Sequence, residues 1–145
     1  MIISHRGNIN GRNPLLENNP GYIDEAIFEG FDVEVDVWID HMSKIFLGHD
    51  EPQYEIDVFW LEERKNKLWI HCKNIDAVVF FNNIKDFHYF WHQNDDVTLT
   101  SKSYIWAYPG KQPIQNSIAV MPEIFEDNTS SCLGVCTDFP IRYKK

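Results

Sequence analysis

The chain has 145 residues, 43% hydrophobic and 14% aromatic, which is enough apolar surface for one packed domain over residues 1–145 and excludes a disordered chain. Its formal net charge of -9 at pH 7 argues against a nucleic-acid or anionic-membrane partner, because both require clustered Lys and Arg. A small phosphorylated substrate stays compatible with this charge, since a metal ion and a few cations can reverse the sign within one pocket.

The compartment is predicted from the termini, the hydropathy and the cysteines. The N-terminal residues show no signal-peptide pattern, and no apolar run approaches the roughly 20 residues that span a bilayer. The three cysteines, Cys72, Cys132 and Cys136, are an odd number, which is typical of free thiols in a reducing compartment. We therefore expect a cytoplasmic protein without a membrane span.

The first elements follow from local patterns. Residues 1–4 form a short apolar segment that predicts a strand ending at His5, and the Asn- and Gly-rich residues 7–18 predict a loop. Asn19 before Pro20 is a helix-start signal, and Gly30 ends the helical spacing of apolar residues that follows.

Strict alternation over residues 31–39 predicts a strand. Asp32, Glu34, Asp36 and Trp38 share one face of it, and Phe31, Val33, Val35, Val37 and Ile39 share the other. The acidic face has two interpretations: a solvated outer face, or the lining of a polar barrel interior or pocket mouth.

Further patterns predict helices over residues 56–65 and 75–84 and strands over residues 44–48, 68–72, 87–91, 104–108, 118–121 and 133–136. The alternation of strand and helix in the first two thirds indicates parallel βαβ units. A complete eight-fold (β/α) barrel takes about 200 residues or more. We therefore expect an α/β fold: a shortened, helix-poor, TIM-like (β/α) barrel with about seven strands, or a partly open version of it.

Four short motifs lie near the predicted strand ends: His5-Arg6-Gly7, Glu17-Asn18, Glu34-Val35-Asp36 and His49-Asp50. In this order and at this spacing they resemble the glycerophosphodiester phosphodiesterase family, and the C-terminal segment at residues 134–140 is similar to that family's last strand. The match covers residues 1–52 well and the last strand moderately. The resemblance implies a TIM barrel of the phospholipase-C-like (PLC-like) phosphodiesterase type and a metal-dependent phosphoric diester hydrolase acting on a small glycerophosphodiester.

The residue types support this chemistry on their own terms. Glu34 and Asp36 lie two apart on one strand, so their carboxylates share a face about 7 Å apart, and paired carboxylates favour Mg²⁺ or Ca²⁺. His5 and His49 follow different strands, and histidine is a residue type that serves as general acid or general base near neutral pH. Arg6 can bind phosphate oxygens through two N–H groups.

The resemblance also implies roles in the third strand, where the family carries Glu-x-Lys. Lys73 fits the phosphate-binding Lys, but His71 replaces the carboxylate. His71 could ligate the metal and shift its preference toward Mn²⁺ or Zn²⁺, could contact the phosphate directly, or could mark weakened metal binding. Additional candidates are Glu123 as a replacement carboxylate, Glu17 as a ligand or orienting group and Trp106 as a pocket residue.

Two other functions remain open at this stage. The same pair of histidines would serve a lyase-type cleavage that gives a cyclic phosphate, and a shrunken barrel could bind a phosphometabolite without turnover. The histidines outside the motifs, His41, His88 and His92, are predicted to be structural or exposed. We expect a small-molecule phosphodiester as the binding partner, and the sequence predicts no particular oligomeric state.

Overall fold

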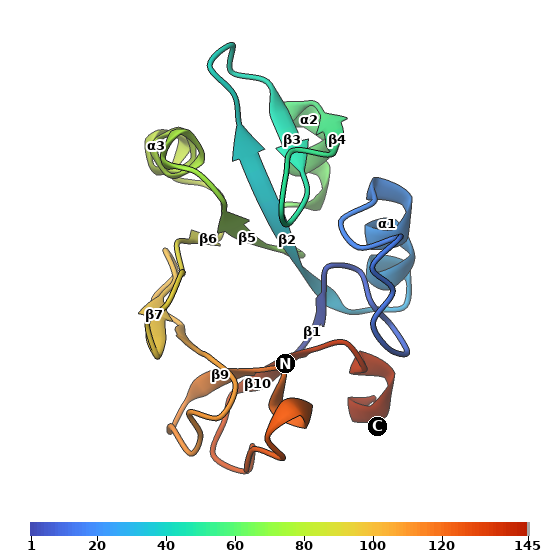
Figure 1. Cartoon of the computed structure of the whole chain (residues 1–145), viewed down its shortest axis with the longest axis vertical. Helices are drawn as coiled ribbons and strands as arrows, with labels where there is room; N and C mark the ends of the chain where they lie inside the picture. The colour runs from blue at the N-terminus through green and yellow to red at the C-terminus, as the bar shows by residue number, and fades with distance from the viewer. Residues whose placement is uncertain (145) are drawn as a thin grey trace.

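The computed structural model describes residues 1–144 and shows a mixed α/β, helix-poor chain with a strongly curled sheet (Figure 1). Its α-helices are α1 (Pro20–Phe28), α2 (Val58–Arg64) and α3 (Ile75–Ile84). Its strands are β1 (Ile2–His5), β2 (Asp32–Ile39), β3 (Ile45–Leu47), β4 (Tyr54–Ile56), β5 (Leu68–Cys72), β6 (Tyr89–Phe90), β7 (Val97–Leu99), β8 (Ile105–Ala107), β9 (Ser117–Val120) and β10 (Gly134–Thr137). Two short 3-10 helices cover Pro122–Ile124 and Pro140–Tyr143.

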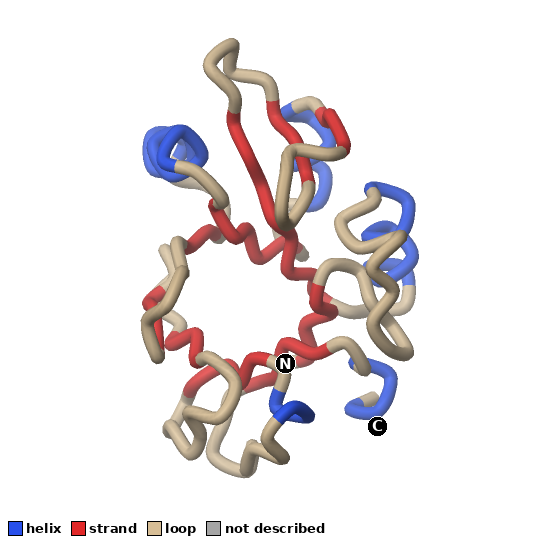
Figure 2. The backbone as a smooth tube through the Cα atoms, in the orientation of Figure 1, coloured by secondary structure: helices blue, strands red, loops and turns tan. Residues whose placement is uncertain are grey.

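Parallel pairing runs through the sheet in the order β6-β5-β2-β1-β10-β9-β8. The hairpin strands β3 and β4 continue antiparallel from β2, and β7 pairs antiparallel with β8. Figure 2 shows these strands around a ring, with the helices outside it. The elements confirm the α/β, helix-poor expectation. Within residues 1–144 no strand pairing joins β6 to β7 or β8, and the TIM-like barrel with about seven strands, or its partly open version, stays a prediction.

The outer face of β2 and its neighbours is covered by the three α-helices. Val33, Val35 and Val37 of β2 point outward and are fully buried. They belong to one apolar cluster with Ile23 and Ala26 of α1, Leu61 of α2 and Ala77 and Phe81 of α3. The alternation of β2 therefore sends its acidic residues to the inner face, where they line the ring rather than the outer surface.

A second apolar cluster lies on the inner face of the ring and includes three large aromatic side chains, Trp69, Phe90 and Trp106. Trp106 of β8 lies 4.6 Å from Phe90 of β6 and 5.7 Å from Trp69 of β5, measured between ring centroids. Ile3, Ile118, Val120 and Cys136 complete this second apolar cluster. Residues 97–144, the last third of the described chain, contain no α-helix, and the strands there are joined by loops and 3-10 turns.

Several predicted boundaries are wrong. The helix predicted from residue 56 begins at Val58. Asp57 is its N-cap and accepts a hydrogen bond from Trp60 N, while Ile56 belongs to β4 and pairs with Ile45 of β3. The short strands β4 and β7 were not predicted, since each has only three residues and is defined by its pairing partner. Among residues 1–144 no helix has the length and apolar character needed to cross a bilayer.

Candidate active site

Strand register brings the motif residues together on the inner face. His5 of β1 is in register with Glu34 of β2, and Asp36 of β2 is in register with His71 of β5. Glu34 is 2% exposed and Asp36 is fully buried. Because these residues stand near the carboxyl ends of adjacent parallel strands, residues distant in the sequence form one polar cluster.

Glu34, Asp36 and His71 each offer a ligand atom, and these atoms all lie within 4.8 Å of one another. Glu34 Oε2 and Asp36 Oδ1 are buried and have no hydrogen-bond partner within residues 1–144. His71 Nε2 lies 2.9 Å from the carbonyl oxygen of His92, which can only accept, so Nε2 carries the proton and Nδ1 faces the two carboxylates. Two carboxylate oxygens that make no hydrogen bond, although His71 and Lys73 lie within ion-pair distance of Asp36 Oδ1, and an imidazole with Nδ1 turned toward them fit a divalent cation.

His71 itself is held between the two acids. Its Nδ1 lies 3.2 Å from Asp36 Oδ1 and 3.6 Å from Glu34 Oε1. Burial alone would lower the pKa of His71, but the two carboxylates raise this pKa to about 9. Burial would raise the pKa of Asp36, yet His71, Arg6 and Lys73 hold it far below its usual value. Without a metal, the imidazolium supplies a positive charge here, and a bound cation would release its proton.

His5 is oriented from behind by Asp138, which follows β10. The distance between His5 Nδ1 and Asp138 Oδ1 is 2.7 Å, and Asn8 Nδ2 donates to the same oxygen at 2.9 Å. Burial opposes ionisation of Asp138, but the contacts with His5 and Asn8 lower its pKa below the ordinary value. His5 Nε2 then faces Glu34, 4.0 Å from its Oε2. The role of Asp138 was missed, because the sequence marks it only as part of the last-strand motif.

Arg6 occupies a tight turn after β1 at a φ of 55°, and Gly7 follows at 91°. A Cβ at Gly7 would stand 2.9 Å from the Tyr22 ring, so this position requires glycine. Arg6 Nε lies 2.9 Å from Asp36 Oδ2, and its Nη1 donates to Glu17 Oε2 at 3.2 Å. Burial would lower the Arg6 pKa, but the surrounding carboxylates raise it, so the guanidinium stays charged.

Two side chains hold this arrangement in place. Glu17 accepts hydrogen bonds from Asn8, Arg6 and Arg12, which places it as the support of Arg6 rather than within the three-residue ligand cluster. Asn18 donates to Asp36 Oδ2 at 2.9 Å and accepts from Asp36 N at 3.0 Å, which fixes the carboxylate relative to its own backbone.

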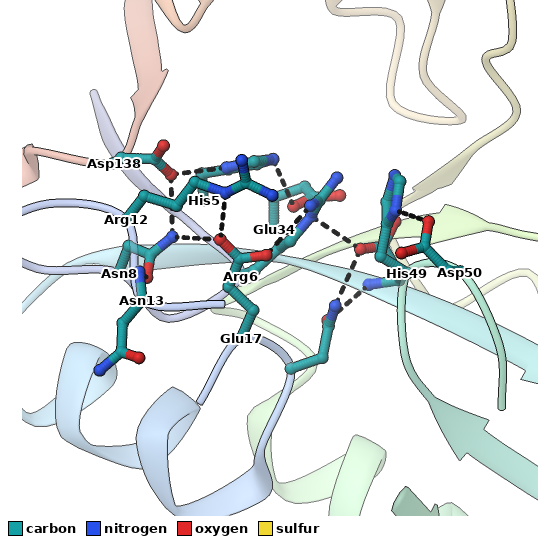
Figure 3. Close-up of polar contacts among 12 residues, drawn as sticks. His5, Arg6, Asn8, Arg12, Asn13, Glu17, Glu34, His49, Asp50 and Asp138 are labelled. Atoms are coloured by element: carbon teal, nitrogen blue, oxygen red, sulfur yellow. Dashed lines mark hydrogen bonds and ion pairs between the residues drawn. The ribbon is translucent and has the colours of Figure 1, made fainter. Parts of the chain in front are cut away.

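His49 is delivered by the turn after β3. Gly48 has a φ of 151°, and a Cβ there would lie 2.0 Å from the Glu51 carbonyl oxygen, so only glycine fits. His49 Nδ1 is 2.7 Å from Asp50 Oδ1, and the His49 side chain is 40% exposed. Figure 3 shows His49 with Asp50 on one flank of Glu34 and Arg6, and His5 with Asp138 on the other.

Two cavities meet at these residues. An inner cavity of about 280 Å³ is bordered by His5, Glu34, His71 and His92, and an outer cavity of about 250 Å³ by Arg12, Glu17, Asp50, Glu51 and Gln53. Arg6 and His49 line both cavities. The two predicted catalytic histidines therefore border one inner cavity, with Arg6 at its junction with the outer one.

The remaining candidates divide between cavity and support. Trp106 lines the inner cavity, and Lys73 Nζ lies 3.6 Å from Asp36 Oδ1. Glu123 lies behind the site: its Oε1 accepts from Thr137 Oγ1 and from Asp138 N, so it is not a member of the ligand cluster.

His92 differs from the expectation of a purely structural or exposed residue. It is 3% exposed, lines the inner cavity and stacks on Tyr108 at 3.5 Å, with Nδ1 buried and unpartnered among residues 1–144. No sequence motif marks it, because it is brought there by the loop after β6. His88 is buried against Trp69 and Thr100, and His41 is exposed, as predicted.

Comparison of the chain with models of known protein families, with curated proteins and with solved structures found no match.

Proposed function

We propose that the chain is a metal-dependent phosphodiesterase that hydrolyses a small glycerophosphodiester-like substrate on a shortened TIM-like barrel of the PLC-like type. The observation that carries the proposal is one inner cavity bordered by two histidines, an arginine and a buried Glu-Asp-His cluster with unpartnered carboxylate oxygens. Phosphodiester cleavage needs this combination: cationic groups for the phosphate oxygens, a base for the nucleophile and an acid for the leaving oxygen.

The cationic side chains would bind and orient the phosphate. Glu34, Asp36 and His71 would hold a divalent cation, which when bound supplies charge neutralisation for a phosphate oxygen. Mg²⁺ or Ca²⁺ suits the two carboxylates, and the imidazole of His71 extends the choice to Mn²⁺ or Zn²⁺. Arg6 at the junction of the cavities would donate to the non-bridging oxygens, with Lys73 as a second cation beside Asp36.

The two histidines would move the protons. Because His5 Nδ1 is bonded to Asp138, its Nε2 is the atom free to take a proton from the attacking water. His49 Nδ1 is bonded to Asp50, which leaves Nε2 to deliver a proton to the leaving alkoxide. If a hydroxyl of the substrate attacks in place of water, the same proton transfers give a cyclic phosphate.

The proposal is tested with glycerophosphocholine and added Mg²⁺, Ca²⁺, Mn²⁺ or Zn²⁺, with phosphorus NMR to identify the product. We expect a phosphomonoester to form, activity to disappear on chelation, and His5→Ala or His49→Ala to lower kcat by about 10²- to 10⁴-fold. His41→Ala, an exposed histidine outside both cavities, is the matched control and should keep full activity. Circular dichroism checks that each variant is folded.

The alternatives give different results in the same experiment. A cyclic phosphate as the stable product would assign lyase chemistry. Calorimetric binding of the diester with no product under any metal would assign a non-catalytic binding role. Full activity in both folded histidine variants would rule out the proposed mechanism.

A further inference from the structure

The outer cavity gives the site a second compartment. A phosphate bound to Arg6 next to His49 lies where the inner and outer cavities meet, because these two residues line both. A phosphodiester has two ester arms, so each arm can enter one cavity. We propose that the outer cavity is a binding subsite for the leaving arm of the diester and that it selects an uncharged, polyhydroxylated arm; this inference rests on the proposed phosphodiesterase function.

The charges of the outer cavity argue against an anionic arm. Arg6 and Arg12 contribute two positive charges, whereas Glu17, Asp50 and Glu51 contribute three negative ones. Arg6 and Arg12 are also both paired with Glu17, at 3.2 and 3.3 Å. A second phosphate or a carboxylate on the leaving arm would therefore meet a compensated or slightly negative surface.

The small apolar part of the outer cavity's lining also limits which leaving arms can bind there. Among the described residues that line it, none is Phe, Tyr or Trp, and only Pro14 is apolar. A trimethylammonium group is bound through the faces of aromatic rings, and an acyl chain requires a continuous apolar lining. A lipid tail finds no partner there, and a choline arm would meet carboxylates but no Phe, Tyr or Trp face to pack on.

What the cavity does offer is a mixture of donors and acceptors. Within residues 1–144, Arg12 uses only its Nε in a hydrogen bond, and the Gln53 side chain makes none. The Asp50 side chain, 93% exposed, accepts at one oxygen from His49. A polyol hydroxyl both donates and accepts, so neighbouring hydroxyls can pair with Arg12, Gln53 and the carboxylates together.

The chemical step follows from this assignment of arms. Water adds to phosphorus and gives a proton to His5 Nε2, while the bond between phosphorus and the outer arm's oxygen breaks. That oxygen takes a proton from His49 and leaves as the free polyol. The inner arm keeps the phosphate as a monoester.

The test compares two diesters that share glycerol phosphate, glycerophosphoinositol and glycerophosphocholine, each with Mg²⁺. We expect kcat/KM for release of glycerol phosphate from the inositol diester to exceed that from the choline diester by about tenfold or more, as one or two hydrogen bonds would give. Phosphorus NMR counts this product alone, because the glycerol arm of the choline diester is itself a polyol and could leave from the outer cavity to give phosphocholine. Gln53→Ala and Arg12→Gln should remove this preference by raising KM for the inositol diester alone. Gln115→Ala, an exposed glutamine outside both cavities, is the matched control.

Equal rates of glycerol phosphate release from the two diesters, a preference for choline as the leaving arm, or variants that slow this release equally from both substrates would overturn the inference. Calorimetry separates it from the proposed function. If the wild type binds the inositol diester in preference to the choline diester, loses that preference in Gln53→Ala and yet turns over neither, the subsite stands and the phosphodiesterase fails. If the wild type releases glycerol phosphate from both diesters at equal rates, the phosphodiesterase stands and the subsite fails.

Discussion

The two ends of strand β2 carry the same kind of residue in opposite circumstances. Asp32 at its beginning and Asp36 near its end point to the same inner face. Both oxygens of Asp32 are satisfied, by Lys67 Nζ at 3.1 Å and by Trp69 Nε1 at 3.2 Å. At the other end, Glu34 Oε2 and Asp36 Oδ1 are buried without a hydrogen-bond partner within residues 1–144.

The difference shows how one strand serves two purposes. At the amino end the acid is neutralised locally and sits beside the aromatic cluster around Trp69, so it contributes to the fold. At the carboxyl end, Arg6, His71 and Lys73 crowd around Asp36. One oxygen of Glu34 and one of Asp36 make no hydrogen bond there within residues 1–144. Buried polar atoms without a hydrogen bond beside perturbed ionisable groups are typical of functional sites. Three experiments test this comparison between the two ends of β2.

The largest effect is expected from Asp36→Asn in metal-free protein. Asp36 faces Arg6 at 2.9 Å, His71 at 3.2 Å and Lys73 at 3.6 Å, so loss of its charge leaves three buried or half-buried cations without their common partner. We expect the free energy of unfolding in urea to fall by about 3 kcal/mol, as when one partner of a buried ion pair is removed. An unchanged urea midpoint would show that this cluster does not contribute to stability.

The second effect is a pair of opposite pH dependences, measured with a chelator present. The pKa of His71 is raised to about 9, above about 6.5 in the unfolded chain, so its contribution is complete below pH 6.5 and is lost as the pH rises to 9. This loss is up to about 3 kcal/mol for a shift of this size. Burial lowers the pKa of His88 to about 4, so the unfolded chain binds more protons between pH 4 and 6.5 and stability falls as the pH falls through that range.

Single substitutions isolate the two slopes. Comparing each variant with the wild type over pH 4–9, we expect His71→Asn to flatten only the alkaline part of the curve and His88→Asn only the acidic part. If His71→Asn leaves the alkaline slope unchanged, the imidazolium is not held between Glu34 and Asp36 in the metal-free protein.

The smallest effect is expected from Asp32→Asn, the same substitution at the other end of the strand. The amide keeps one acceptor for Trp69 and loses only the partly exposed ion pair with Lys67, so unfolding should become easier by about 1 kcal/mol or less. Diester hydrolysis should match the wild-type rate. A large loss of activity here would show that the two ends are coupled.

Local sequence determined much of the first half of this protein. The period-2 pattern of residues 31–39, the Asn19 cap before Pro20 and the glycines after His5 and before His49 are short-range constraints, and the structure contains the corresponding elements. They place His5, Glu34 and His49 at strand ends, and register then brings them to one cavity.

Only the tertiary structure decided which acids are satisfied and which are not. Asp32 and Asp36 have the same parity on one strand, and the difference between them comes from Lys67, Trp69, Asn18 and His71, which reach them from other segments. The same holds for Asp138 behind His5, Glu123 behind Asp138 and His92 in the cavity. These contacts join residues up to 133 positions apart, and such pairings depend on strand order and register, which no local pattern contains.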